Sequence, residues 1–161
     1  MAFTTAQLHS PVGYWLTIDD KKNQPRSVIH ITEAKQGGQT ALVGHVAAGL
    51  YVEGLKWRTQ CTNCVAPYTN KPLMGMKILW GFQSQGDKWN STWTNGQLFD
   101  VDSNKNIYRG KLWLTDNGMK MQVRGYAFMF FRTQTWKRLT MAEVKRYQQL
   151  MLQQLKAHPV K

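Results

Sequence analysis

The chain has 161 residues, of which 42% are hydrophobic and 19% are charged, so it lacks the low hydrophobicity of a disordered protein. Its apolar runs are far shorter than the roughly 20 residues that a helix needs to span a bilayer, which excludes a helical membrane protein. Lysine and arginine number 21 against 9 acidic residues, a formal net charge of +12. A surface this basic attracts nucleic acid, anionic lipid or acidic ligands.

We expect a single domain over residues 1–161, because the sequence contains neither an internal repeat nor a low-complexity linker. Runs rich in β-branched and aromatic residues recur along the chain, separated by turns of Gly, Asn, Asp and Lys. They predict a mostly-β fold, an antiparallel sandwich or closed barrel over residues 10–138. The predicted strands are Val12–Ile18, Ser27–Glu33, Thr40–Ala47, Leu73–Gly81, Lys88–Trp93, Ile107–Leu114, Lys120–Met129 and Arg132–Arg138.

The last stretch of the chain predicts a helix over residues 140–158. Thr140 followed by Glu143 is a capping box, and Pro159 ends the pattern. Between them, apolar residues recur at steps of three and four and form one stripe. The stripe consists of Met141, Val144, Tyr147, Met151 and Leu155. We expect it to pack on the barrel or on a partner subunit as a homodimer contact, and a basic helix lying on an anionic membrane is the alternative.

The two cysteines, Cys61 and Cys64, form a C-T-N-C motif within the loop-like run Leu55–Pro72. This spacing suits a local disulfide in an oxidising compartment, a redox pair or half of a zinc site. A redox motif needs a strand-to-helix context and a zinc site needs further ligands, whereas the four histidines are scattered. We favour the disulfide, and the redox and metal interpretations stay open.

The start of the chain, Met1-Ala2-Phe3, leads directly into polar sequence, so we expect no leader peptide within these residues. We therefore expect a cytosolic protein or the mature form of an exported one, and a disulfide favours the second.

Several phrases occur in a distinctive order and spacing. They are Ser10–Asp20 (SPVGYWLTIDD), Cys61–Cys64, Asn70–Pro72 leading to Gly75–Gly81 (GMKILWG), Gly96 followed by Asp100, Tyr108–Leu114 (YRGKLWL), Val123–Tyr126 (VRGY) and Arg132–Arg138 (RTQTWKR). Together they resemble the bacterial family called domain of unknown function 2147, from about Ser10 to Arg138. The helix after Arg138 lies outside the usual pattern of that family.

The resemblance implies a lipocalin-like (calycin) antiparallel barrel of about eight or more strands in a periplasmic or secreted protein, and it implies no established activity. Relatives often carry another residue, frequently cysteine, where Gly110 stands, and without it Cys61–Cys64 is the one intrachain pairing. Gly13 and Trp15 on the first strand, with Arg138 on the last, are similar to the lipocalin signature. There the indole plugs the narrow end of the barrel and the guanidinium stacks on it, a structural role.

A ligand site inside the barrel is predicted from alternation along the strands. Arg124 and Tyr126 share a face and resemble the Arg-x-Tyr pair with which intracellular fatty-acid-binding proteins hold a carboxylate. The predicted pocket consists of Arg124, Tyr126, Gln134 and Trp136, with Met76, Trp80 and Trp113 as apolar lining. Alternation leaves open which face is interior, so the arginine could instead pair with Asp19 or Asp100, or face solvent.

Catalysis finds little support, because most acidic residues fall in turns and no nucleophile elbow or phosphate-binding loop is present. We expect no catalytic residue, no metal and no cofactor. The predicted function is that of a non-enzymatic exported carrier of a small amphipathic or hydrophobic ligand, with a carboxylate as one candidate head group. The alternative is a surface-interaction protein whose basic face and final helix bind an anionic polymer, a membrane or a partner subunit. Nucleic acid is not the expected partner, since four tryptophans lie in strand patterns that should bury them, namely Trp15, Trp80, Trp113 and Trp136.

Overall fold

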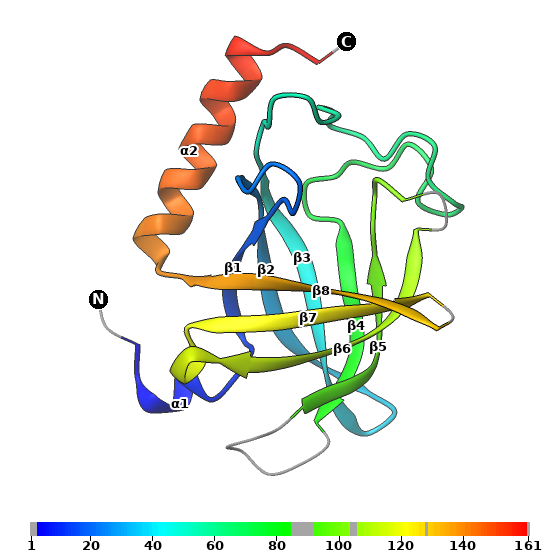
Figure 1. Cartoon of the computed structure of the whole chain (residues 1–161), viewed down its shortest axis with the longest axis vertical. Coiled ribbons are helices and arrows are strands. Elements are labelled where there is room, and N and C mark those ends of the chain that lie inside the picture. The colour runs from blue at the N-terminus through cyan, green and yellow to red at the C-terminus, as the bar shows by residue number, and fades with distance from the viewer. Residues whose placement is uncertain (1–2, 85–91, 104–105, 128, 161) are drawn as a thin grey trace.

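The computed structural model describes residues 3–84, 92–103, 106–127 and 129–160, and in them eight antiparallel strands form a closed barrel with a helix on its outside (Figure 1). Each strand pairs with the next, and β1 pairs with β8 to close the barrel. The elements are α1 (Thr5–Leu8), β1 (Gly13–Ile18), β2 (Pro25–Gln36), β3 (Gln39–Gly49), β4 (Lys77–Ser84), β5 (Thr92–Phe99), β6 (Ile107–Thr115), the 3₁₀ turn η1 (Asp116–Gly118), β7 (Lys120–Ala127), β8 (Phe130–Leu139) and α2 (Met141–Ala157). This confirms the predicted mostly-β barrel with a C-terminal helix.

The fifth strand continues further along the chain than predicted. The prediction ran over Lys88–Trp93, whose residues 88–91 lie outside the described ones, whereas β5 continues through Phe99. Asn95 and Gly96, a pair that favours turns, obscured the strand. In the barrel Asn95 takes a left-handed φ of 60° at an irregularity between Trp93 and Gly96, and pairing with β6 resumes after it.

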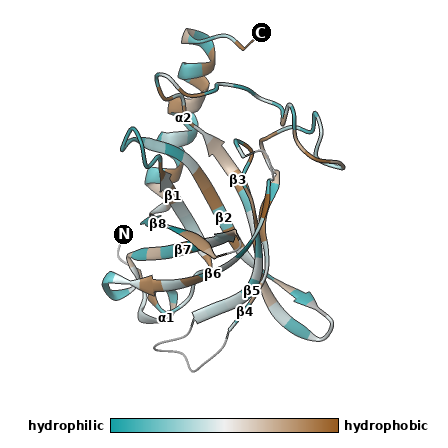
Figure 2. Cartoon of the chain, turned by 45° about the vertical axis from the view of Figure 1, so that its right-hand side comes forward, coloured by the Kyte–Doolittle hydropathy of each residue, from teal (hydrophilic) through white to brown (hydrophobic). Residues whose placement is uncertain are grey.

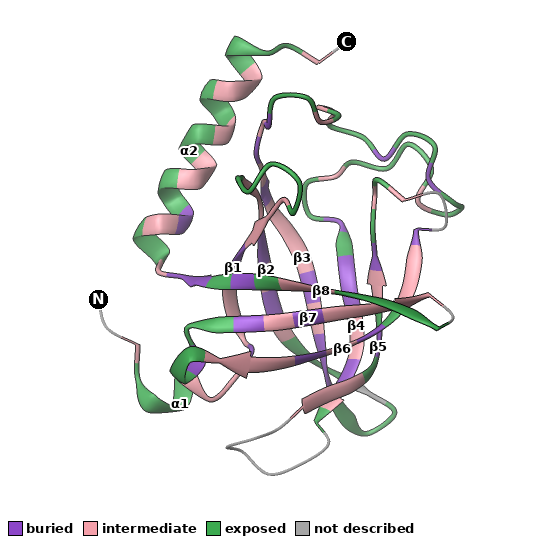
Figure 3. Ribbon diagram, in the orientation of Figure 1, coloured by how far each residue is buried: buried purple, intermediate pink, exposed green. Residues whose placement is uncertain are grey.

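The interior of the barrel is filled by apolar side chains. Trp15, Phe82, Leu112 and Met121 are fully buried in one continuous cluster. Gly96 shows how dense the packing is, because a Cβ there would lie 2.1 Å from a ring carbon of Phe82. Figure 3 shows the buried segments along the strands and the exposed ones in the loops and on the outer side of α2.

Helix α2 packs on the outside of the barrel, as its apolar stripe predicted. Thr140 caps the helix and forms the predicted capping box with Glu143. Val144 is 1% exposed and joins a second cluster with Leu16, Val28 and Leu139, against which Tyr147 and Met151 also pack. Figure 2 shows hydrophobic and hydrophilic segments alternating along α2, so the helix uses one face for packing. Met141, the first residue of the stripe, is 52% exposed and does not take part.

Candidate functional site

One end of the barrel is sealed by Trp15 and Arg138, which are paired neighbours on β1 and β8. The guanidinium carbon of Arg138 lies 4.4 Å from the centre of the Trp15 ring. Its three nitrogens donate to the backbone carbonyls of Gly118 (2.8 Å), Val12 (3.1 Å) and Ser10 (2.7 Å). A Cβ on Gly13 would lie 3.1 Å from Nη1 of Arg138, so the glycine gives the guanidinium room. Burial lowers the pKa of Arg138 to about 10, which leaves it charged at neutral pH.

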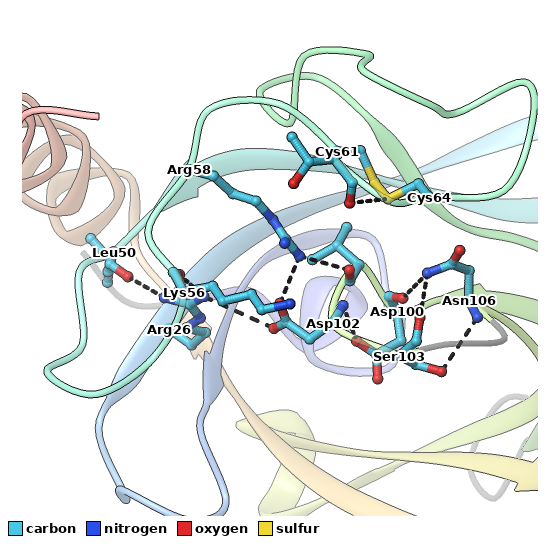
Figure 4. Close-up of polar contacts among 12 residues, drawn as sticks. Arg26, Leu50, Lys56, Arg58, Cys61, Cys64, Asp100, Asp102, Ser103 and Asn106 are labelled. Carbon is cyan, nitrogen blue, oxygen red and sulfur yellow. Dashed lines mark hydrogen bonds and ion pairs between the residues drawn. A yellow bond between two sulfur atoms is a disulfide. The ribbon is translucent and has the colours of Figure 1, made fainter. Parts of the chain in front are cut away.

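The opposite end is covered by the long segment between β3 and β4, which carries the disulfide Cys61–Cys64. Both cysteines are buried in the interior cluster, and Cys61 is fully buried. The polar groups around them are already engaged with one another (Figure 4). Arg58 donates to the carbonyl of Val101 (2.7 Å) and to Oδ1 of Asp102 (2.8 Å). These bonds tie the disulfide segment to the turn between β5 and β6.

Asn106 is the centre of the hydrogen bonds that join the disulfide segment to the β5–β6 turn, and no sequence pattern predicted this role. Its side chain is fully buried and its backbone takes a left-handed φ of 68°. Its Nδ2 donates to the carbonyls of Asp100 (2.8 Å) and Ser103 (2.7 Å), and its Oδ1 accepts from the backbone N–H of Val65 (2.9 Å). An asparagine closing a turn rich in Asp, Ser and Asn is the signal that would have pointed to it.

The seven residues predicted to line one pocket lie on two sides of the sheet, which corrects that grouping. Trp136 and Met76 belong to the interior cluster. Gln134, on the same face of β8 as Trp136, accepts from its indole Nε1 (3.2 Å) and reaches Asp20 in the turn between β1 and β2 (3.5 Å). Arg132, one alternation further along β8, donates to the same carboxylate from Nε (2.6 Å).

Arg124, Tyr126 and Trp113 lie on the outer face, whereas Trp80 on β4 is partly buried and packs against the interior cluster. On β7 the interior face is taken by Met121 and Val123, which are buried, so the intervening residues point outward. The register across the strands places Lys111 beside Arg124 and Arg109 beside Tyr126. Arg124 therefore pairs with neither Asp19 nor Asp100, and it does not share a pocket with Trp136.

The outer side of β6, β7 and β8 combines cations with aromatic rings, and we call it the basic aromatic face. Rows of paired residues cross the three strands without a register shift. From residue 107 to 139 the sequence contains seven lysines and arginines against Asp116 as its one acid. This count is the sequence signal that would have located the face. Its residues are Arg109, Lys111, Trp113, Lys120, Arg124, Tyr126, Phe131 and Lys137.

Arg124 is held in place at the centre of this face. Its guanidinium carbon lies 4.2 Å from the centre of the Phe131 ring and 5.1 Å from that of Trp113. Its Nε donates to Oγ1 of Thr133 (2.8 Å), which leaves the two terminal nitrogens directed away from that bond. Within the described part of the chain, the acid that approaches the face is Asp116, whose Oδ2 lies 4.0 Å from Nζ of Lys120. A guanidinium fixed in this way is suited to bind a phosphate or carboxylate through its free fork.

A cleft of about 200 Å³ lies elsewhere, near the turn between β2 and β3. Its apolar wall includes Leu42, Phe82 and Trp93, and Glu33 and Thr40 also line it. This volume is below the 300 Å³ at which drug-sized pockets begin.

Comparison with known proteins identifies a family and no activity. Among the described residues, no helix combines the length and the apolar composition needed to cross a bilayer. No curated protein and no solved structure is detectably similar to the chain. The family model described as an uncharacterized protein conserved in bacteria, DUF2147, matches residues 13–138. Because this match runs from the first residue of β1 almost to the end of β8, the chain belongs to that bacterial family.

Proposed function

We propose that the protein is a non-enzymatic binding protein whose basic aromatic face attaches it to an anionic polymer or surface. The observation that carries the proposal is Arg124, fixed between two aromatic rings and flanked by Arg109 and Lys111, neither of which has a carboxylate partner among the described residues. The dense interior argues against a large ligand inside the barrel.

We also propose that the protein works outside the cytoplasm. The disulfide Cys61–Cys64 supports this, because disulfides persist in oxidising compartments.

The first test removes charge from the face. Replacing Arg109, Lys111 and Arg124 together by glutamine is expected to weaken binding to heparin and to anionic vesicles on the order of 100-fold at low salt, since each cation near an anionic surface contributes about 1 kcal/mol. Affinity is measured by titration at several salt concentrations, and the salt dependence is expected to become shallower in the variant.

The matched control is a variant in which Lys35, Lys71 and Lys145 become glutamine, because these lysines are exposed and lie off the face. This control has the same net charge as the test variant. Its affinity for heparin and for anionic vesicles is expected to fall less than about fivefold, since separated surface charges are screened. Equal losses in the two variants would assign binding to net charge and reject the face. Failure of the unmodified protein to bind any anionic probe at low salt would reject the proposed function.

The cleft near the β2–β3 turn supports a second candidate function, carriage of a small amphipathic molecule. Its wall of Leu42, Phe82 and Trp93 suits an aliphatic chain, and Glu33 favours an ammonium or hydroxyl head group over a carboxylate. Native mass spectrometry is expected to detect an octylamine adduct and no octanoate adduct. Thr40→Phe, at the cleft, should abolish the adduct, while Thr62→Phe, at an exposed site elsewhere, should retain it. An adduct that survives Thr40→Phe would contradict this site.

A further inference from the structure

The β7–β8 hairpin exposes an unusual run of apolar side chains at its end. Met129 is 91% exposed, Phe130 76% and Phe131 59%. The first two are the most exposed of the large apolar residues described, and the three are consecutive. Figure 3 shows the start of β8 exposed where the hairpin extends from the barrel. Exposed apolar residues that occur singly need no explanation, whereas a contiguous patch marks an interaction site.

We propose that residues 129–131 insert into an anionic phospholipid leaflet, so that the hairpin and the basic aromatic face together anchor the protein to a membrane. The inference rests on the proposed function and specifies its anionic surface as a lipid bilayer.

The backbone of the hairpin is suited to a lipid interface. A segment that enters lipid must satisfy its backbone hydrogen bonds internally. Here β7 and β8 stay paired to the end, with Ala127 opposite Phe130 and Tyr126 opposite Phe131. Phe130 and Phe131 are therefore presented on a backbone that is already paired.

The order of residues along the hairpin follows the layers of a leaflet. Met129 and Phe130 form the apolar tip, and Tyr126 and Phe131 make the next row, where aromatic side chains suit the membrane interface. Arg124 comes three residues before Ala127, roughly 10 Å further back at about 3.3 Å per residue. That distance matches the depth of about 5–10 Å to which interfacial segments enter, and it places Arg124 and Lys111 at the level of the phosphates.

Charge complementarity and the apolar tip select lipid over other anionic partners. Phosphate groups of any polymer would satisfy Arg109, Lys111 and Arg124, but a polyanion offers nothing to Met129 and Phe130. Stable attachment to membranes takes two signals, such as apolar insertion combined with a basic patch, and the hairpin supplies both. Helix α2, the other candidate for membrane contact, has Val144, Tyr147 and Met151 committed to the barrel.

The test uses the full chain with vesicles of phosphatidylcholine alone or with 30% phosphatidylglycerol. We expect the protein to bind the vesicles that contain phosphatidylglycerol and not those of phosphatidylcholine alone. Changing both Met129 and Phe130 to serine should lower partitioning into the anionic vesicles at least tenfold. The control changes Met141 and Leu152 to serine, two exposed apolar residues on α2, and should bind as the unmodified protein does. Both variants alter exposed side chains, and urea unfolding checks that each is folded.

A second measurement reports insertion directly. Met129→Cys supplies the one free thiol for a spin label, because Cys61 and Cys64 are joined. The label is expected to lie below the lipid phosphates on anionic vesicles, whereas a label at Leu152→Cys should stay in water. A label at position 129 that stays in water, or a double serine variant that partitions normally, would overturn the inference. Heparin binding separates failure of this inference from failure of the proposed function. If the basic aromatic face binds anions, the double serine variant should still bind heparin. If the unmodified protein does not bind heparin, the face itself does not bind anions.

Discussion

Replacing Arg138 by methionine is expected to lower the free energy of unfolding by about 3–5 kcal/mol, because one buried and two partly buried backbone carbonyls lose their donors together. Methionine keeps an unbranched apolar stem but removes the guanidinium, and with it every donor and the stacking on Trp15. The carbonyls of Ser10, Val12 and Gly118 would then be left without the bonds that Arg138 now donates to them. Each buried acceptor that loses its donor costs about 1–3 kcal/mol, and these costs overlap because one side chain serves all three.

Urea unfolding followed by tryptophan fluorescence measures this effect, and Arg132→Met is the matched control. Arg132 lies on the same face of the same strand, but its side chain is 63% exposed and pairs with an exposed Asp20. Exposed pairs of this kind contribute about 0–1 kcal/mol, so the control should unfold nearly as the unmodified protein does. Arg138→Lys should fall between the two, because an ammonium group lacks the planar fork that reaches three carbonyls at once. A loss below about 1 kcal/mol in Arg138→Met would contradict the sealing role inferred for the residue.

The seal at the Trp15 end is also the contact between the most distant parts of the chain that was predicted from the sequence. Gly13, Trp15 and Arg138 are far apart in the sequence, yet the resemblance to lipocalins pairs them, and the structure places Trp15 and Arg138 side by side. The strands and the capped helix could be predicted from the sequence for a simpler reason. Their signals are local, namely β-branched runs between turn residues, and Thr140 with Glu143 at the start of α2.

Which face of each strand points into the barrel could not be predicted from local signals. Alternation identifies which residues share a side of a strand, but it does not state which side faces the core. On β6 to β8 both sides carry a tryptophan and an arginine, Trp113 and Arg124 outside and Trp136 and Arg138 inside. Because neither face of these strands is clearly more hydrophobic than the other, the predicted pocket combined residues from both faces. Register across neighbouring strands resolves the question, because it places the outward cations in adjacent rows.

Asn106 illustrates a different limit, since its importance depends on a contact between segments far apart in the chain. The bond from Val65 connects the turn after β5 to the disulfide segment, 41 residues away. No periodic pattern marks such a residue. Its left-handed backbone and its buried amide, with every hydrogen-bonding atom engaged, can be recognised once the fold is known.

Replacing Asn106 by aspartate is therefore expected to destabilise the protein by about 3–5 kcal/mol at neutral pH, as for an unpaired charge in a buried network. The shape of the side chain is kept, but an oxygen replaces the amide nitrogen that donates to the carbonyls of Asp100 and Ser103. Burial and these two facing oxygens should raise the pKa of the introduced carboxyl in the folded state above its unfolded value. Between the two pKa values the folded state then binds more protons than the unfolded state, so the deficit should shrink as the pH falls toward 4 and should level off once the pH exceeds the pKa of the folded state.

The control for this experiment is Asn117→Asp, which makes the same chemical change at an asparagine that also has a left-handed φ, of 53°, but is exposed. Its effect should stay within about 0.5 kcal/mol, the usual range for surface substitutions, and should vary little with pH. Limited proteolysis adds a spatial readout. If Asn106 holds the disulfide segment against the β5–β6 turn, the aspartate variant should be cleaved faster between residues 50 and 76 than elsewhere, because the bond from Val65 is the link that weakens. Equal destabilisation by the two variants, or a deficit that grows on acidification, would mean that the buried amide does not organise this end of the barrel.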